Sequence, residues 1–296
     1  MYLSCSSLVC PLDTYPTIAD VLRALKALGF QAFDLAAFEG WQNVDPSRLA
    51  GGGDAWSRAF VDAVAAAGMH VSSFNCGFSK PLNDPDPAAF AQCRREYLAL
   101  LDLAEAVGCG NLTVQPGNPI AGQAHSRCLR NQFRRQARDR SFDTLLAHLS
   151  ELAALAQGRG VTLGVEAHYG SLLEKPEDAQ RMAQALWPGV GLTYDPSHLV
   201  MQGIPLPEAE ALLAYTVHVH VRNAALHKMQ ETMADGLVDW AWLVGALRAH
   251  GYRGALAIEY FGGFDAGGDA LHRGDALHRF ENTRALRDRL LALGVR

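Results

Sequence analysis

Four short apolar runs in the second half of the chain each end near a side chain that can bind a cation or accept a proton. These four side chains are Glu166, Asp195, His220 and Glu259. Along a β-strand, successive side chains point to opposite faces. In strands, Glu166 and His168 would therefore share one face, as would His218 and His220, with the neighbouring Val165, Val219 and Val221 on the other. The polar groups would then all point inward from neighbouring strands.

Three carboxylates gathered with an imidazole need a positive charge among them. Carboxylates that crowd together repel one another unless protons or a cation neutralise them. A divalent cation would leave the set with a net charge of about −1. This oxygen-rich set suits Mn²⁺ or Mg²⁺ best and is compatible with Co²⁺ or Zn²⁺, whereas structural zinc sites use Cys and His. We therefore expect one divalent ion per chain, held by the ligands Glu166, Asp195, His220 and Glu259.

Two further histidines flank this set. His218 lies two residues before His220 in the same run. We expect it one layer deeper, as a packing group or as a support for a ligand. His198 follows Asp195 by three residues, across a turn that begins with Pro196. It can point into the same site and donate a hydrogen bond to a substrate, and a surface-loop histidine is the alternative interpretation.

The elements that must position these residues alternate along the whole chain. Apolar or β-branched runs predict strands at Tyr2–Ser7, Ala32–Ala37, His70–Cys76, Asn111–Gln115, Thr162–Ala167, Val190–Tyr194, Thr216–Val221 and Ala255–Tyr260. Amphipathic segments, most of them followed by glycine, predict helices at Ile18–Leu28, Trp56–Ala67, Pro87–Val107, Phe142–Gln157, Pro176–Leu186 and Trp240–His250. Such alternation with short connections implies parallel strands.

Eight predicted strands alternating with helical segments in 296 residues predict an α/β fold, a single (β/α)8 TIM barrel spanning residues 1–296. Active sites of such barrels lie at the C-terminal ends of the strands, where the four candidate ligands fall. A doubly wound open sheet is the alternative fold. The turn after the first predicted strand, residues 8–12, contains no glycine, which disfavours a phosphate loop of the Rossmann type.

Composition disfavours several classes of protein. The net charge of −5 argues against a nucleic-acid partner. No apolar run reaches the roughly 18 residues that a membrane helix needs. The N-terminus has no basic segment followed by an apolar one, so we expect a cytoplasmic protein without a secretory signal. The six cysteines form no CxxC pair, and we expect free thiols in a reducing compartment.

Several different short motifs follow one another along the chain. They include Pro81-Leu82-Asn83, Val114-Gln115-Pro116-Gly117, Val165-Glu166-Ala167-His168, Tyr194-Asp195-Pro196-Ser197-His198, His218-Val219-His220-Val221-Arg222-Asn223, Asp235-Gly236-Leu237-Val238-Asp239-Trp240 and Ile258-Glu259. In this order, and over nearly the whole chain, they resemble the xylose isomerase-like TIM barrels. More specifically, they resemble the sugar phosphate isomerase/epimerase superfamily, which includes endonuclease IV and the inosose dehydratases. The resemblance implies the same four metal ligands.

The chain departs from the family pattern beside two of these ligands. The family commonly has Asn where this chain has His168, and Lys-Asp where it has Arg222-Asn223. Arginine keeps the positive charge and adds a planar bidentate donor. We expect His168 and Arg222, together with His198, to contact an oxygen-rich substrate whose identity stays open. Residues 225–240 hold no Asp-x-His pair of the endonuclease kind, which disfavours DNA repair.

Proton transfer next to a carbonyl is the chemistry that this set performs most directly. A cation that chelates the carbonyl and hydroxyl oxygens of a sugar or sugar derivative stabilises a metal-bound enediolate. Glu166 and Glu259 are the candidate catalytic bases that remove and return the proton. Return to the same carbon gives an epimerase, and return to the neighbouring carbon gives an isomerase.

Three other functions are alternatives to this hypothesis. Loss of a hydroxyl from the enediolate would make the protein an inosose dehydratase-like lyase acting on a keto-polyol. A non-catalytic sugar-binding barrel is the alternative outside the enzymes. A Schiff-base aldolase is disfavoured because none of the lysines, Lys26, Lys80, Lys175 and Lys228, ends a predicted strand.

One long connection after the fourth predicted strand, residues 117–141, is rich in arginine. The arginines are Arg127, Arg130, Arg134, Arg135, Arg138 and Arg140. Long connections in compact domains are often functional. We expect either a lid that meets an anionic or oxygen-rich substrate or an interface in a homo-oligomer.

Overall fold

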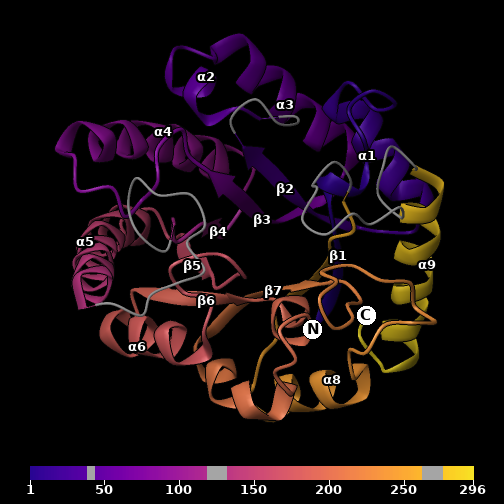
Figure 1. Ribbon diagram of the computed structural model, residues 1–296. Coiled ribbons are helices and arrows are strands. Elements are labelled where there is room, and N and C mark those ends of the chain that lie inside the picture. The colour runs from indigo at the N-terminus through magenta and orange to yellow at the C-terminus, as the bar shows by residue number, and fades with distance from the viewer. Residues whose placement is uncertain (39–43, 119–131, 262–275) are drawn as a thin grey trace.

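Eight parallel strands close into a barrel at the centre of the molecule, and helices surround it (Figure 1). The computed structural model describes residues 1–38, 44–118, 132–261 and 276–296. The strands are β1 (Tyr2–Ser6), β2 (Ala32–Phe38), β3 (His70–Gly77), β4 (Asn111–Val114), β5 (Thr162–Glu166), β6 (Val190–Tyr194), β7 (Thr216–Val221) and β8 (Ala255–Ile258). Each pairs with the next, and β8 closes on β1 with Tyr2 opposite Ala255. The expected single (β/α)8 barrel is confirmed, and the open sheet is excluded.

The helical layer contains every helix expected from the sequence and some that were not. The α-helices are α1 (Ile18–Ala27), α2 (Pro46–Ala50), α3 (Asp54–Ala67), α4 (Pro87–Ala106), α5 (Gln132–Gln157), α6 (Pro176–Leu186), α7 (Pro196–Val200), α8 (Trp240–Ala249) and α9 (Ala276–Ala292). A 3₁₀ helix at Leu206–Tyr215 and the helices α2, α7 and α9 were not predicted. In α9, charged residues separate the few buried apolar positions, such as Leu286 and Leu290. Among the described residues, no helix is both long and apolar enough to cross a membrane.

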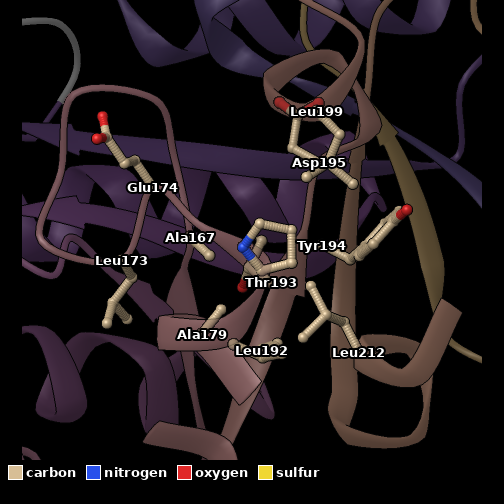
Figure 2. A pocket seen from close by; sticks show the side chains of 11 residues that line it. Ala167, Leu173, Glu174, Ala179, Leu192, Thr193, Tyr194, Asp195, Leu199 and Leu212 are labelled. Carbon is tan, nitrogen blue, oxygen red and sulfur yellow. The ribbon is translucent and has the colours of Figure 1, made fainter. Parts of the chain in front are cut away.

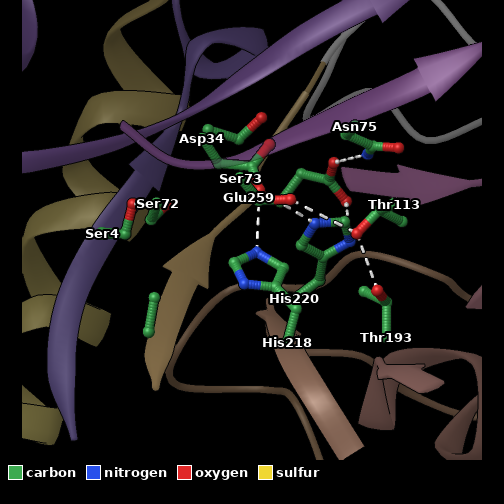
Figure 3. Close-up of polar contacts among 12 residues, drawn as sticks. Ser4, Asp34, Ser72, Ser73, Asn75, Thr113, Thr193, His218, His220 and Glu259 are labelled. Atoms are coloured by element: carbon green, nitrogen blue, oxygen red, sulfur yellow. Dashed lines mark hydrogen bonds and ion pairs between the residues drawn. The ribbon is translucent and has the colours of Figure 1, made fainter. Parts of the chain in front are cut away.

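The strands separate apolar from polar side chains, as the alternation predicts. Val165, Val219 and Ile258 are fully buried in the apolar core. Buried hydroxyl groups pair across other strands, as in the 2.7 Å contact between Thr113 Oγ1 and Thr193 Oγ1 (Figure 3). Burying polar groups is costly unless they are hydrogen-bonded, so this network makes the polar barrel interior stable.

The cysteines of the described residues are free and buried, as the sequence analysis expects. They are Cys5, Cys10, Cys76, Cys93 and Cys109. Burial raises the pKa of Cys10 to about 12, because an apolar environment disfavours the thiolate. Cys128 lies outside the described residues. The five described thiols are therefore core side chains of low reactivity.

The arginine-rich connection is helical over its second part, because α5 begins at Gln132 rather than at Phe142. Arg127 and Arg130 lie outside the described residues, as do the side chains of Arg134 and Arg135. Arg138 forms an ion pair with Asp178 of α6 and donates to the carbonyl of Leu172 at 2.9 Å. Arg140 is exposed. Arg138 thus joins α5 to α6, and the lid or interface role of the other arginines stays a prediction.

Replacing Arg138 by alanine is expected to lower the free energy of unfolding by roughly 1–2 kcal/mol, because a largely buried charged hydrogen bond is lost. Arg140→Ala is the matched control, since it removes an exposed arginine from the same helix. Urea unfolding of the two variants measures the difference. Equal midpoints would show that the contact with Asp178 contributes little.

Candidate metal centre

The structure brings the four candidate ligands together inside the barrel. Ligand atoms of Glu166, Asp195, His220 and Glu259 all lie within 4.8 Å of one another. Each of these four residues is at most 5% exposed. Glu166 ends β5 and His220 lies in β7, while Asp195 and Glu259 directly follow β6 and β8. Four consecutive strands therefore deliver one carboxylate or imidazole each to a single buried point.

Asp195 divides its two oxygens between the fold and the cluster. Its Oδ1 accepts a 2.8 Å hydrogen bond from the backbone N–H of Ser197 and so caps α7, which begins with Pro196. Its Oδ2 is buried and lies 2.7 Å from Arg222 NH2, yet it makes no well-aligned hydrogen bond among the described residues. A buried carboxylate oxygen without a well-aligned hydrogen bond is suited to binding a cation.

A chain of amide groups from β3 and the residue after β4 holds the two glutamates. Asn75 donates to Glu259 Oε1 at 3.0 Å (Figure 3). Gln115 Nε2 lies 3.2 Å from Asn75 Oδ1 and 2.9 Å from Glu166 Oε2. The remaining oxygen of Glu166, Oε1, lies 2.9 Å from His220 Nδ1. The chain therefore fixes how both carboxylates face the cluster.

Arg222 lies among the candidate ligands and is only 1% exposed. Its NH1 donates to Glu259 Oε2 at 2.5 Å, and its NH2 is 2.7 Å from Asp195 Oδ2. The guanidinium also lies over the ring of Phe261, 4.9 Å from its centroid. Three carboxylates, one guanidinium and a divalent cation would sum to no net charge. The donor set and its charge thus fit a buried divalent ion.

Burial and neighbouring charges shift the pKa values of the two glutamates in opposite directions. Burial raises the pKa of Glu259 to about 7, despite the positive charges of His220 and Arg222. Burial also acts to raise the pKa of Glu166, but the charge and hydrogen bond of His220, together with the neighbouring histidines, outweigh it and lower that pKa well below its usual value. One carboxylate is therefore ionised at neutral pH while the other can hold a proton, as in acid–base pairs of enzymes.

Two histidines beside the cluster are placed where a substrate could meet them. Burial lowers the pKa of His198 to about 4, so its ring is neutral at pH 7. Arg222 NH2 lies 3.1 Å from His198 Nε2, which leaves the proton on Nδ1, a buried atom without a partner among the described residues. The ring of His168 lies 5.7 Å from that of His198. These positions agree with the substrate-binding roles expected for both, which stay proposals.

A small cavity is lined in part by Asp195. It is lined mainly by apolar residues of α6, β6 and the 3₁₀ helix, including Ala179, Leu192 and Leu212 (Figure 2). Its volume is about 10 Å³, which is room for about one water molecule. This cavity between the barrel and its helices cannot hold a sugar.

The sequence as a whole matches a known protein family. A family model described as "Xylose isomerase-like TIM barrel" matches residues 22–278. The chain belongs to the xylose isomerase-like TIM barrels. This confirms the family resemblance drawn from the motifs.

Curated relatives of this xylose isomerase-like barrel match only in part. An inosose dehydratase of Glaesserella parasuis serovar 5 is 24% identical over 143 residues, which are 41% of this chain and 48% of the relative. An inosose dehydratase of Geobacillus thermodenitrificans is 24% identical over 191 residues, or 57% and 63% of the two chains. The chain thus spans about half the length of the first of these relatives and less than two thirds of the second.

Solved structures match this xylose isomerase-like barrel over its full length. The 3-keto-D-glucoside 4-epimerase of E. coli superposes with a TM-score of 0.69 at 18% identity, covering 99% of this chain and 98% of its own. A D-psicose 3-epimerase from Clostridium cellulolyticum H10, solved with D-tagatose, gives 0.77 at 15% identity and covers both chains fully. At these identities the likeness establishes the common fold.

Three polar residues of this barrel's site were not found by sequence reasoning. Asn75 and Gln115 form the amide chain, and Asp34 contacts both His218 and His220, at 2.8 and 3.4 Å. One signal was present, because Asp34 is the single charged residue of the otherwise apolar β2. The contact with Asp34 also places His218 in a supporting position, as expected. Asp34, His218 and His220 form a second group whose geometry could hold a cation.

The affinity of the cluster for a divalent cation is expected to rise with pH. Burial lowers the pKa of His220, but the charges of Glu259 and Glu166 raise it well above its usual value, and that of Glu259 is about 7. At a pH below the pKa of His220 or Glu259, a proton occupies that ligand and must leave before a cation binds. The association constant for Mn²⁺ should therefore increase about tenfold or more per pH unit between about pH 6 and 7.

Calorimetric titration in buffers of different ionisation enthalpy measures both this affinity and the number of protons released. A dissociation constant that stays the same between about pH 6 and 8, with no proton release, would contradict the prediction.

Proposed function

We propose that this xylose isomerase-like barrel is a divalent-metal-dependent isomerase or epimerase that moves a proton next to the carbonyl of a sugar or sugar derivative. The observation that carries the proposal is the pair of buried carboxylates, Glu166 and Glu259, at one candidate cation site. Mn²⁺ or Mg²⁺ fits the donor set best. The bound ion would supply Lewis-acid stabilisation of the negative charge that develops on the substrate oxygens.

The two glutamates supply the proton transfer. A carboxylate within hydrogen-bond reach of the carbon-bound proton removes it, and a second group returns one. The opposite pKa shifts of Glu166 and Glu259 support such a pair, since one group starts ionised and the other can carry a proton near pH 7. Asn75 and Gln115 hold both carboxylates in place, so little reorganisation is needed when a substrate binds.

The remaining polar groups orient the substrate and balance charge. His198 has a buried N–H at Nδ1 to donate to a substrate hydroxyl, and His168 lies beside it. Arg222 contacts Asp195 and Glu259 directly and balances part of their negative charge. A sugar or keto-polyol, which is rich in hydroxyl groups, suits this set of donors.

An inosose dehydratase-like lyase is the second candidate. The curated relatives that match part of the chain are inosose dehydratases. Dehydration begins with the same proton removal next to a carbonyl, and it ends with loss of a hydroxyl group instead of proton return. Either glutamate could then protonate the departing hydroxyl.

Deuterium exchange tests the proposal and separates the candidates. The Mn²⁺-loaded protein is incubated in deuterated water with a panel of ketoses and keto-polyols, and the metal is removed before proton NMR. Deuterium at the carbon next to the carbonyl, with an epimer or isomer formed, supports the proposal. Exchange with loss of water identifies the lyase. Binding of sugars without exchange at any carbon would contradict both and leave a non-catalytic sugar-binding barrel.

A further inference from the structure

The mechanism proposed above gives no role to Asp34, a buried acid beside the candidate cluster. Asp34, in the middle of β2, is completely buried. Its Oδ2 lies 2.8 Å from His218 Nε2 and 3.4 Å from His220 Nε2 (Figure 3). A carboxylate in such a place is costly unless it is hydrogen-bonded. The two imidazole rings, which belong to β7, provide these hydrogen bonds to Oδ2 of Asp34.

The contact with Asp34 decides which nitrogen of His220 keeps its proton when a cation binds at the other. A carboxylate accepts hydrogen bonds, so His220 Nε2 must be the donor in this contact. The other ring nitrogen also lies beside a carboxylate and donates to it, and a cation that binds there would take the place of its proton and leave the Nε2–H tautomer. That nitrogen, Nδ1, is the one that faces the cluster, at 2.9 Å from Glu166 Oε1 and 3.7 Å from Glu259 Oε2. Without an acceptor at Nε2, nothing in these contacts would favour this tautomer.

His218 supports this arrangement from the layer below. It makes the shorter of the two contacts to the same oxygen of Asp34. Its ring is nearly perpendicular to that of His220, with an interplanar angle of 89° and 5.1 Å between centroids. His218 therefore fixes the carboxylate that in turn orients His220.

We propose that Asp34, anchored by His218, is a positioning residue that sets the tautomer and orientation of His220 for binding a divalent cation through Nδ1. This inference rests on the cation site of the proposed function. Partners of this kind behind a metal-binding histidine are important for affinity, and their loss typically weakens metal binding about 10–100-fold.

The same three residues, Asp34, His218 and His220, could instead hold a cation of their own. The contacts favour the positioning role. The short contact of 2.8 Å between Asp34 and His218 is that of a direct hydrogen bond. A cation held by these three residues would have to replace that hydrogen bond. A count of bound ions separates the two possibilities.

The test compares metal-free wild type with Asp34→Asn, which keeps the size of the side chain and removes its charge. Calorimetric titration with Mn²⁺ gives the stoichiometry and the dissociation constant. The tautomer of His220 is read from ¹⁵N–¹H long-range correlation spectra of the Mg²⁺-loaded proteins, and the signal is assigned by its absence in His220→Gln. The matched control is Ser4→Ala, which removes a buried hydrogen bond to Ser72 in the same barrel interior.

We expect one ion per wild-type chain, affinity reduced about 10–100-fold in Asp34→Asn, and loss of the single Nε2–H tautomer. Ser4→Ala should bind as wild type does, even if it unfolds at a lower temperature. A folded Asp34→Asn with wild-type affinity and tautomer would overturn the proposal. So would two ions per wild-type chain with one lost in Asp34→Asn, because Asp34 would then be a ligand.

Two further outcomes keep the test decisive. If the wild type binds no ion, the cation site of the proposed function fails, and this inference fails with it. If Asp34→Asn does not fold, His218→Leu replaces it, since this change leaves Asp34 but removes the donor of its shorter hydrogen bond. His218→Leu should weaken Mn²⁺ binding and broaden the tautomer signal of His220, and wild-type values for both would overturn the proposal.

Discussion

Glu259→Gln is expected to lower turnover at least about 100-fold while the barrel stays folded, because a general base is lost. Glutamine has nearly the same size and can still accept the hydrogen bond that Asn75 donates to Oε1. It cannot accept a proton at neutral pH, and it loses the ionic contact with Arg222. Deuterium exchange into the substrate carbon measures the rate, and circular dichroism verifies the fold.

The matched control is Glu281→Gln, the same substitution at an exposed position of α9. Its rate should equal that of the wild type. If Glu259→Gln retained more than about a third of the wild-type rate, Glu259 would not be the base, since loss of a general base costs far more.

Asp195→Asn and Glu166→Gln are expected to lose most of the bound divalent cation. Each removes one negative oxygen ligand, and carboxylates are the ligands that Mn²⁺ and Mg²⁺ prefer. In Asp195→Asn the side-chain carbonyl can still accept the hydrogen bond from Ser197 N–H, and asparagine caps helices as well as aspartate does. The fold should therefore survive while the charge disappears. Elemental analysis of protein purified without chelators measures the metal content.

Asp86→Asn is a close control for this substitution. Asp86 caps α4 through the N–H of Ala88 and, like Asp195, precedes a proline at the start of its helix. It lies outside the candidate cluster, so its metal content should equal that of the wild type. Unchanged metal content in both Asp195→Asn and Glu166→Gln would refute the ligand assignment.

The sequence alone determined the barrel and the strand ends that face the site. Apolar runs alternating with amphipathic segments predict parallel strands, and the period of two within a strand predicts which side chains share a face. Both signals are local, so neighbouring residues in the chain are enough to place Glu166 and His220 on the inward face. The arginine-rich connection carried no such periodicity, and the true start of α5 at Gln132 was missed for this reason.

Only the tertiary structure decided what surrounds the candidate ligands. Asn75 contacts Glu259 and Asp34 contacts His218 across 184 residues of chain each. The sequence around a polar residue of β2 or β3 does not indicate which residue of β7, or which residue after β8, it will contact. Those partners are set by closure of the barrel, which brings the first strands beside the last. The opposite pKa shifts of Glu166 and Glu259 have the same origin, because burial and neighbouring charges exist only in the folded chain.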